Sequence, residues 1–107
     1  MTGQDRLAQL VRAGVLHNWA GLLYDAAKYS EALEYNEKAL AISKATLGDN
    51  HPSTATAYYV VALVHYEMGE HDQALSAMQA AHAAYLACLG PDHPATINAA
   101  DTLQDWS

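Results

Sequence analysis

Apolar residues recur along this chain with the three-to-four-residue spacing of an amphipathic α-helix. The first such stretch runs from roughly Leu7 or Leu10 to Ala26. Its apolar positions are Val15, Leu16, Trp19, Leu22 and Leu23. A turn at residues 27–29 follows, and Ser30 is the expected N-cap of a second helix that ends near Thr46. In this second helix Leu33, Ala39 and Leu40 are expected to face inward.

Glycine and proline residues divide the remaining chain into three more predicted helices. Gly48 ends the second helix, and Pro52 opens a third that runs to about Met68 before a turn at Gly69. Asp72 is the expected cap of a fourth helix, which ends near Cys88. The fifth predicted helix spans residues 95–106. It is expected to turn Ile97, Ala100, Leu103 and Trp106 inward.

A fixed displacement of 42 positions relates two passages of the chain. Leu47-Gly48-Asp49-Asn50-His51-Pro52 returns as Leu89-Gly90-Pro91-Asp92-His93-Pro94. Outside this passage, Ala20, Tyr24, Ala32, Leu33, Ala39, Ala41 and Ala45 recur as Ala62, Tyr66, Ala74, Leu75, Ala81, Ala83 and Ala87. Such a period indicates stacked copies of one helix pair. We expect one domain over residues 1–107, with repeats at about 10–51 and 52–93 and a half-repeat at 94–106.

Charge is distributed unevenly and restricts the classes of partner. All five basic residues precede residue 45 and are balanced there by acidic ones, so residues 45–107 carry the whole net charge of −7. Nucleic-acid binding requires neutralisation of phosphates and is not expected. An anionic membrane surface is disfavoured for the same reason, and no apolar run approaches the roughly 20 residues of a membrane span. A basic or neutral partner remains compatible; the simpler interpretation is an acidic surface that maintains solubility.

Residues with catalytic or metal-binding chemistry form no recognisable site. His51 and His93 belong to the repeated passage, so we expect them to cap or pack near the start of the following helix. No two histidines lie at the i, i+4 spacing of a helical metal site, and no phosphate-binding glycine loop occurs. We therefore expect no metal, no cofactor and no enzymatic activity. Cys88 is the only cysteine, which excludes an internal disulfide and favours a reducing, cytoplasmic setting.

The repeated positions resemble those of the tetratricopeptide repeat. Small residues, Ala20 and Ala62, stand where the two helices of a pair cross, and Tyr24 and Tyr66 follow them. The stretch 34–40 is similar to the family's second helix. The period of 42 and the Leu-Gly-x-x-His-Pro link resemble the longer variant found in kinesin light chains. The resemblance implies an all-α, right-handed α-solenoid of two and a half repeats and five helices. It also implies a protein–protein interaction module.

In this family the first helices of the repeats line a concave groove that binds peptides. By that register the partner-binding residues here are His17, Asn18, Tyr24, Asp25, Tyr59, Leu63, Tyr66, Glu67 and Asp101. Of the paired asparagines common in kinesin light chain repeats, only Asn18 is present. None of the expected groove residues is basic, so a clamp for a carboxylate is not expected. A basic or apolar peptide segment that stacks on Tyr59 and Tyr66 fits better, although both tyrosines could instead serve only to pack the helix pair.

A self-associating structural unit is the alternative function. Three or more repeats are usually needed for a stable stack, and this chain has about two and a half. Either end, residues 1–16 or 95–106, could pair with a second copy to form a homodimer, including by exchange of the last helix. A piece of a longer regulatory protein is a third interpretation.

Overall fold

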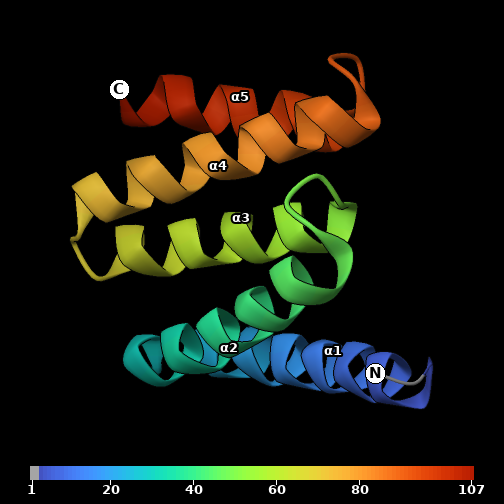
Figure 1. Ribbon diagram of the computed structural model, residues 1–107. Helices are drawn as coiled ribbons and strands as arrows, with labels where there is room; N and C mark the ends of the chain where they lie inside the picture. The colour runs from blue at the N-terminus through green and yellow to red at the C-terminus, as the bar shows by residue number, and fades with distance from the viewer. Residues whose placement is uncertain (1–2) are drawn as a thin grey trace.

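The computed structural model of the chain describes residues 3–107, with side-chain surroundings from residue 5 onward (Figure 1). Within that range it contains five α-helices and no strand. They are α1 (Gly3–Asp25), α2 (Tyr29–Leu47), α3 (Pro52–Glu67), α4 (His71–Leu89) and α5 (Pro94–Trp106). Each helix packs against the next in a flat stack that measures 44 × 33 × 19 Å. The predicted all-α solenoid of two helix pairs and a final single helix is confirmed.

α1 begins earlier than the apolar pattern predicted. The helix starts at Gly3 rather than at Leu7 or Leu10. Arg6 has high helix propensity, and Asp5 lies in the first turn, where its negative carboxylate interacts favourably with the positive end of the helix dipole. The prediction followed apolar positions only, and polar residues that favour helix extend α1 beyond them.

The two hairpin turns are closed by backbone hydrogen bonds. At the end of α3, Gly69 N–H donates to the Tyr66 carbonyl at 3.0 Å and Glu70 N–H donates to the His65 carbonyl at 2.9 Å. This pair of bonds ends a helix through one residue in the left-handed conformation. Gly69 has φ 79°, and Ala27 takes the same role after α1 with φ 60°. The predicted turn at Gly69 is confirmed.

The predicted caps Ser30 and Asp72 are wrong. The N-cap residues of α2 and α4 are Lys28 and Glu70, and neither side chain makes a capping hydrogen bond. Ser30 and Asp72 lie inside the first turn of their helices. The backbone hydrogen bonds of each hairpin turn allow the next helix to begin directly after the left-handed residue. The helix therefore starts before either polar side chain can cap it.

The repeated passage ends one helix and starts the next, as predicted. Gly48 and Gly90 follow α2 and α4 with φ 86° and 85°. His51 and His93 are the N-caps of α3 and α5, and each Nδ1 atom accepts a hydrogen bond at 3.1 Å from the backbone N–H two residues later. The recurring histidines therefore serve to start helices.

Small side chains form much of the core. Ala20, Ala32, Ala62 and Ala74 are all 0% exposed, which allows the helices of each pair to approach closely, and Ala39 is buried while Leu33 and Leu40 are half-buried. In α5, Leu103 and Trp106 pack against the buried cluster that contains Met78 and Tyr85, as predicted, and Ala100 is half-buried.

Ile97 is 46% exposed, so its predicted burial is wrong. By the period it corresponds to Ala13 and Ala55, both buried beside the second helix of their own pair. Among the residues that the structure describes, α5 has no such second helix to cover Ile97.

One face of α1 presents a row of apolar side chains to solvent. Leu16 is half-buried and Leu23 is buried against the rest of the core, whereas the other predicted apolar positions of α1 are exposed. The exposed row, which we call the outer α1 stripe, consists of Leu7, Val11, Val15, Trp19 and Leu22, each 50–62% exposed. The corresponding α3 residues Ala57, Val61 and Val64 are buried because the first helix pair covers them.

Candidate partner-binding face

The predicted site residues are distributed over three helices, α1, α3 and α5. All of them lie on the first helices of the pairs, so we call this set the first-helix face. Its members are His17, Asn18, Tyr24, Asp25, Tyr59, Leu63, Tyr66, Glu67 and Asp101. A hydrogen bond of 2.9 Å from Asn98 Nδ2 to Tyr59 Oη connects α5 to α3. Tyr59 and Leu63 are half-buried against the core, which leaves only part of each side chain available to a partner.

Tyr24 lies at the junction of α1 with the end of α3. Burial raises the pKa of its hydroxyl group above the ordinary value, and the negative charge of Glu67 raises it further, followed by Tyr29, Asp25 and Tyr59. The ring of Tyr24 also meets the ring of Tyr29 edge to face, with 5.6 Å between centroids. The hydroxyl group therefore stays protonated and remains a hydrogen-bond donor.

Tyr66 takes part in an aromatic cluster at the other edge of the face. Its ring stacks on Trp106 with 4.5 Å between centroids and 4° between planes, and it meets the His71 ring edge to face at 5.1 Å. The side chain nonetheless remains 39% exposed. One side of the ring is thus held by Trp106 of α5, and part of the side chain remains accessible to solvent.

Carboxylates are the exposed charges of the first-helix face. Asp25, Glu67 and Asp101 are all exposed. Two basic side chains of α2 have contacts of their own: Lys38 pairs with Glu34 of the same helix at 3.5 Å, and Lys44 lies 5.7 Å from the centre of the Tyr58 ring of α3. A cationic segment would therefore find countercharge on this face.

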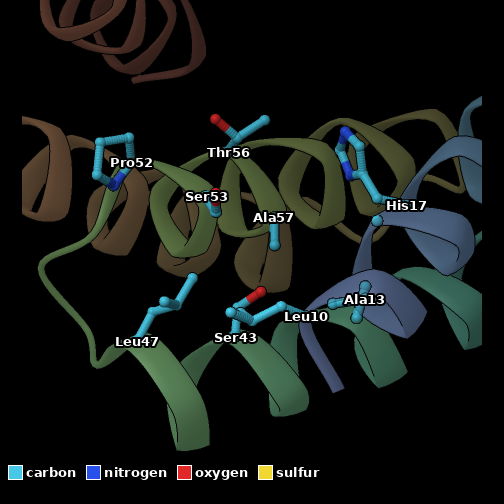
Figure 2. A pocket seen from close by; sticks show the side chains of 11 residues that line it. Leu10, Ala13, His17, Ser43, Leu47, Pro52, Ser53, Thr56 and Ala57 are labelled. Atoms are coloured by element: carbon cyan, nitrogen blue, oxygen red, sulfur yellow. The ribbon is translucent and has the colours of Figure 1, made fainter. Parts of the chain in front are cut away.

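A pocket of about 300 Å³ opens between α1, α2 and α3 (Figure 2). Its lining residues are Leu10, Ala13, Gly14, His17, Ala39, Ser43, Leu47, Pro52, Ser53, Thr56 and Ala57. His17 is the one member of the predicted set that lines it. Its neighbour Asn18 is exposed outside the pocket. The lining combines aliphatic carbon with hydroxyl groups and one imidazole and includes no Lys, Arg, Asp or Glu.

The α2 residues of the pocket were missed by sequence reasoning. Ala39, Ser43 and Leu47 come from a second helix, whereas the predicted site used only first helices. Ala39 was expected only as a core residue. A signal was present in the period, because Ser43 is a small residue at the position that Tyr85 occupies in the next copy.

Other chemistry is sparse across the described part of the chain. No group of three or more His, Cys, Asp or Glu side chains there could hold a metal ion. Cys88 is a half-buried free thiol. None of the helices combines the length and the apolar character that crossing a membrane requires.

Comparison with known proteins identifies the repeat. A sequence model of the tetratricopeptide repeat family matches residues 11–87 and again residues 61–103. No curated protein matches the chain at a significant level. The two matched ranges together cover most of the sequence and overlap, as expected for repeated units. The helix pairs, the buried alanines at their crossings and this match agree: the chain belongs to the tetratricopeptide repeat family.

Proposed function

We propose that this protein is an interaction module that binds a basic or apolar peptide segment of a partner protein on its first-helix face. Repeats of this family generally mediate protein–protein interaction. The observation that carries the proposal is that Asp25, Glu67 and Asp101 are exposed on the first helices, which also carry the partly exposed ring of Tyr66. Carboxylates attract Lys and Arg side chains, and an aromatic ring provides a surface on which those cations and apolar groups can stack.

The period of 42 and the repeated Leu-Gly-x-x-His-Pro passage also support assignment to the kinesin-light-chain-like variant of the repeat. The peptide chemistry would differ from that of the light chains, because this face carries carboxylates where acidic cargo would require cations. In the proposed complex, His17 and Asn18 donate or accept hydrogen bonds. Tyr24, Tyr59, Leu63 and Tyr66 supply contact area.

Peptide titrations test the charge preference. Two fluorescein-labelled peptides of equal length are compared by fluorescence anisotropy, one with alternating Lys and Leu residues and the other with Glu in place of Lys. We expect the basic peptide to bind more tightly, with an affinity that falls as salt is added. Tighter binding of the acidic peptide would refute the proposal.

Two variants localise the binding surface. Glu67→Gln removes one exposed carboxylate of the face and should weaken binding of the basic peptide several-fold. Asp92→Asn removes one negative charge from the loop before α5, outside the face, and serves as the matched control. Equal loss in both variants would mean that overall charge, rather than this face, attracts the peptide.

A second candidate function, self-association, is favoured by the outer α1 stripe. A contiguous apolar row on one helix is unusual at a solvent-exposed surface and commonly marks an interface. We infer that two copies pair through their α1 helices, because residues 1–44 are neutral overall and residues 45–107 carry the −7 charge. Pairing at α1 keeps the acidic halves apart, whereas pairing at α5 would bring them together.

Sedimentation equilibrium over a range of concentrations tests this pairing. We expect a monomer–dimer equilibrium that Val15→Glu shifts to monomer, since Val15 is 62% exposed and central in the stripe. Ile97→Glu is the matched control at the other end of the stack and should leave the equilibrium unchanged. A strict monomer at all concentrations would contradict self-association and leave the peptide-binding proposal intact.

A further inference from the structure

The pocket beside Ser43 corresponds to a site that a tyrosine fills in the second repeat. A displacement of 42 positions carries Ser43 onto Tyr85, which is 6% exposed. The same displacement carries three pocket-lining alanines, Ala13, Ala39 and Ala57, onto Ala55, Ala81 and Ala99. These counterparts belong to the buried cluster that contains Tyr85. The fold therefore builds the same site twice, open in one copy and filled by a tyrosine side chain in the other.

The filled site shows which chemistry the surroundings accept. The Tyr85 ring packs among alanine side chains, and its hydroxyl group lies 2.7 Å from Thr56 Oγ1, within hydrogen-bond distance. Burial raises the pKa of Tyr85, so the phenol stays neutral. This site therefore suits a phenol: it offers an apolar surface to the ring and a hydroxyl group that can bond to the phenol oxygen.

The open site is wider because its neighbours are smaller. In the second repeat Tyr59 and Asn98 close one side with their hydrogen bond. Their counterparts in the first repeat are His17 and Thr56, whose side chains are shorter and line the pocket. The imidazole of His17 and the hydroxyl groups of Ser43 and Ser53 add polar atoms to a mainly aliphatic lining. The Thr56 hydroxyl group, by contrast, already bonds to Tyr85, and its own counterpart in the first repeat is Gly14.

The volume is sufficient for an aromatic side chain. An apolar cavity of about 150 Å³ in another protein holds benzene. The pocket here measures about 300 Å³, at the small end of the range of ligand sites. It therefore accommodates one ring with its hydroxyl group.

We propose that the pocket between α1, α2 and α3 binds a tyrosine side chain of a partner protein, in the place that Tyr85 occupies in the second repeat. This inference rests on the proposed peptide-binding function and adds the residue that anchors the peptide. The partner's ring packs against Ala39 and Ala57, and its phenol bonds to the polar groups of His17 or Ser43.

The compound p-cresol, which has the structure of a tyrosine side chain, serves as the probe. It is titrated into the ¹⁵N-labelled full chain and followed by amide chemical shifts. We expect saturable shifts at Ser43, Thr56 and neighbouring pocket residues. Isobutanol, an aliphatic alcohol, should bind at least tenfold more weakly. Equal affinity for both compounds, or p-cresol shifts confined to other parts of the molecule, would overturn the proposal.

Filling the pocket from within should abolish binding. Ser43→Tyr copies the second repeat and should eliminate the p-cresol shifts, whereas Ala41→Tyr, on the exposed side of the same helix, should leave them unchanged. If Ser43→Tyr does not fold, Ser53→Trp at the exposed edge of the pocket provides the block, with the same expected loss. Persistence of the shifts in a folded pocket-filling variant would overturn the proposal.

The two proposals fail in distinguishable ways. If p-cresol binds in the pocket and neither the basic nor the acidic peptide binds, the pocket stands and the peptide-binding function fails. If a tyrosine-containing basic peptide binds equally to wild type and Ser43→Tyr while Glu67→Gln weakens it, the peptide-binding function stands and the pocket proposal fails.

Discussion

The indole ring of Trp106 lies parallel to the ring of Tyr66, with 4° between their planes and 4.5 Å between their centroids. The pair joins the last turn of α5 to the last turn of α3, so α5 is held at its end as well as along its buried face. The stack also fixes the orientation of Tyr66, which belongs to the proposed binding face.

Removing this stack should weaken the attachment of α5. Trp106→Ala is expected to lower the free energy of unfolding by about 2 kcal/mol, less than the roughly 3–5 kcal/mol of a fully buried aromatic residue, because Trp106 is only half-buried. Trp106→Phe retains a ring and should lose about half as much. Urea denaturation followed by circular dichroism measures both. Equal losses in the two variants would show that the stack itself contributes nothing.

Thr54 and Thr96 occupy equivalent positions in successive repeats, yet their replacement by valine should affect stability differently. Thr54 Oγ1 donates to the Gly48 carbonyl at 2.8 Å, whereas the buried Oγ1 of its counterpart Thr96 has no partner among the described residues. Thr54→Val should lower the free energy of unfolding by about 1 kcal/mol, and Thr96→Val should leave it unchanged or raise it. Chemical denaturation of both variants provides the comparison. A larger loss in Thr96→Val would contradict the assignment.

Asn36 is expected to be a site where the native residue lowers stability. Its side chain is 0% exposed, and neither amide atom has a hydrogen-bond partner in the described structure. Met78 occupies the equivalent position in the second repeat. Asn36→Leu keeps a similar volume and removes the unpaired polar atoms, so it should raise the free energy of unfolding by about 1–3 kcal/mol. A lower melting temperature for Asn36→Leu would show that the amide is satisfied in solution.

The two hairpin turns offer a reciprocal exchange. Ala27 adopts φ 60°, a conformation that an L-residue with a β-carbon disfavours, while Gly69 occupies the same place in the second hairpin. Ala27→Gly should raise the free energy of unfolding by about 0.5–1 kcal/mol after the added chain entropy of glycine is subtracted. Gly69→Ala should lower it by a similar amount. Thermal melts of both variants test the sign, and a loss in Ala27→Gly would refute the argument.

The period made most of the helix boundaries predictable. Because Gly48, Gly90, Pro52 and Pro94 recur at equivalent places, the ends of α2 to α5 could be placed within about two residues from sequence alone. Alanines at the crossings could be assigned in the same way, since only small residues allow that approach.

Features that depend on a neighbouring element could not be predicted. Trp19 and Val61 are equivalent in sequence, yet one is 50% exposed and the other 6%, because a helix pair covers only Val61. The pocket likewise could not be predicted, because it forms only where three helices meet. It is recognised only when Ser43 is compared with Tyr85 in the other copy. Asn36 is buried without a hydrogen-bond partner because of the helices that pack around it. Its polar side chain gave no signal of this burial in the sequence.

The unlike ends of the stack set a limit on how many copies can assemble. The apolar row on α1 contrasts with the exposed positions of α5, where Ile97 is accompanied by the polar Gln104. Contacts that join α1 of one molecule to α5 of the next would repeat without end and build a filament. Two molecules that pair through their α1 helices are related by a twofold axis, and the pairing buries both apolar rows at once. Under the proposed α1 pairing the assembly would close at two copies, so the same helix that promotes self-association would also prevent polymerisation.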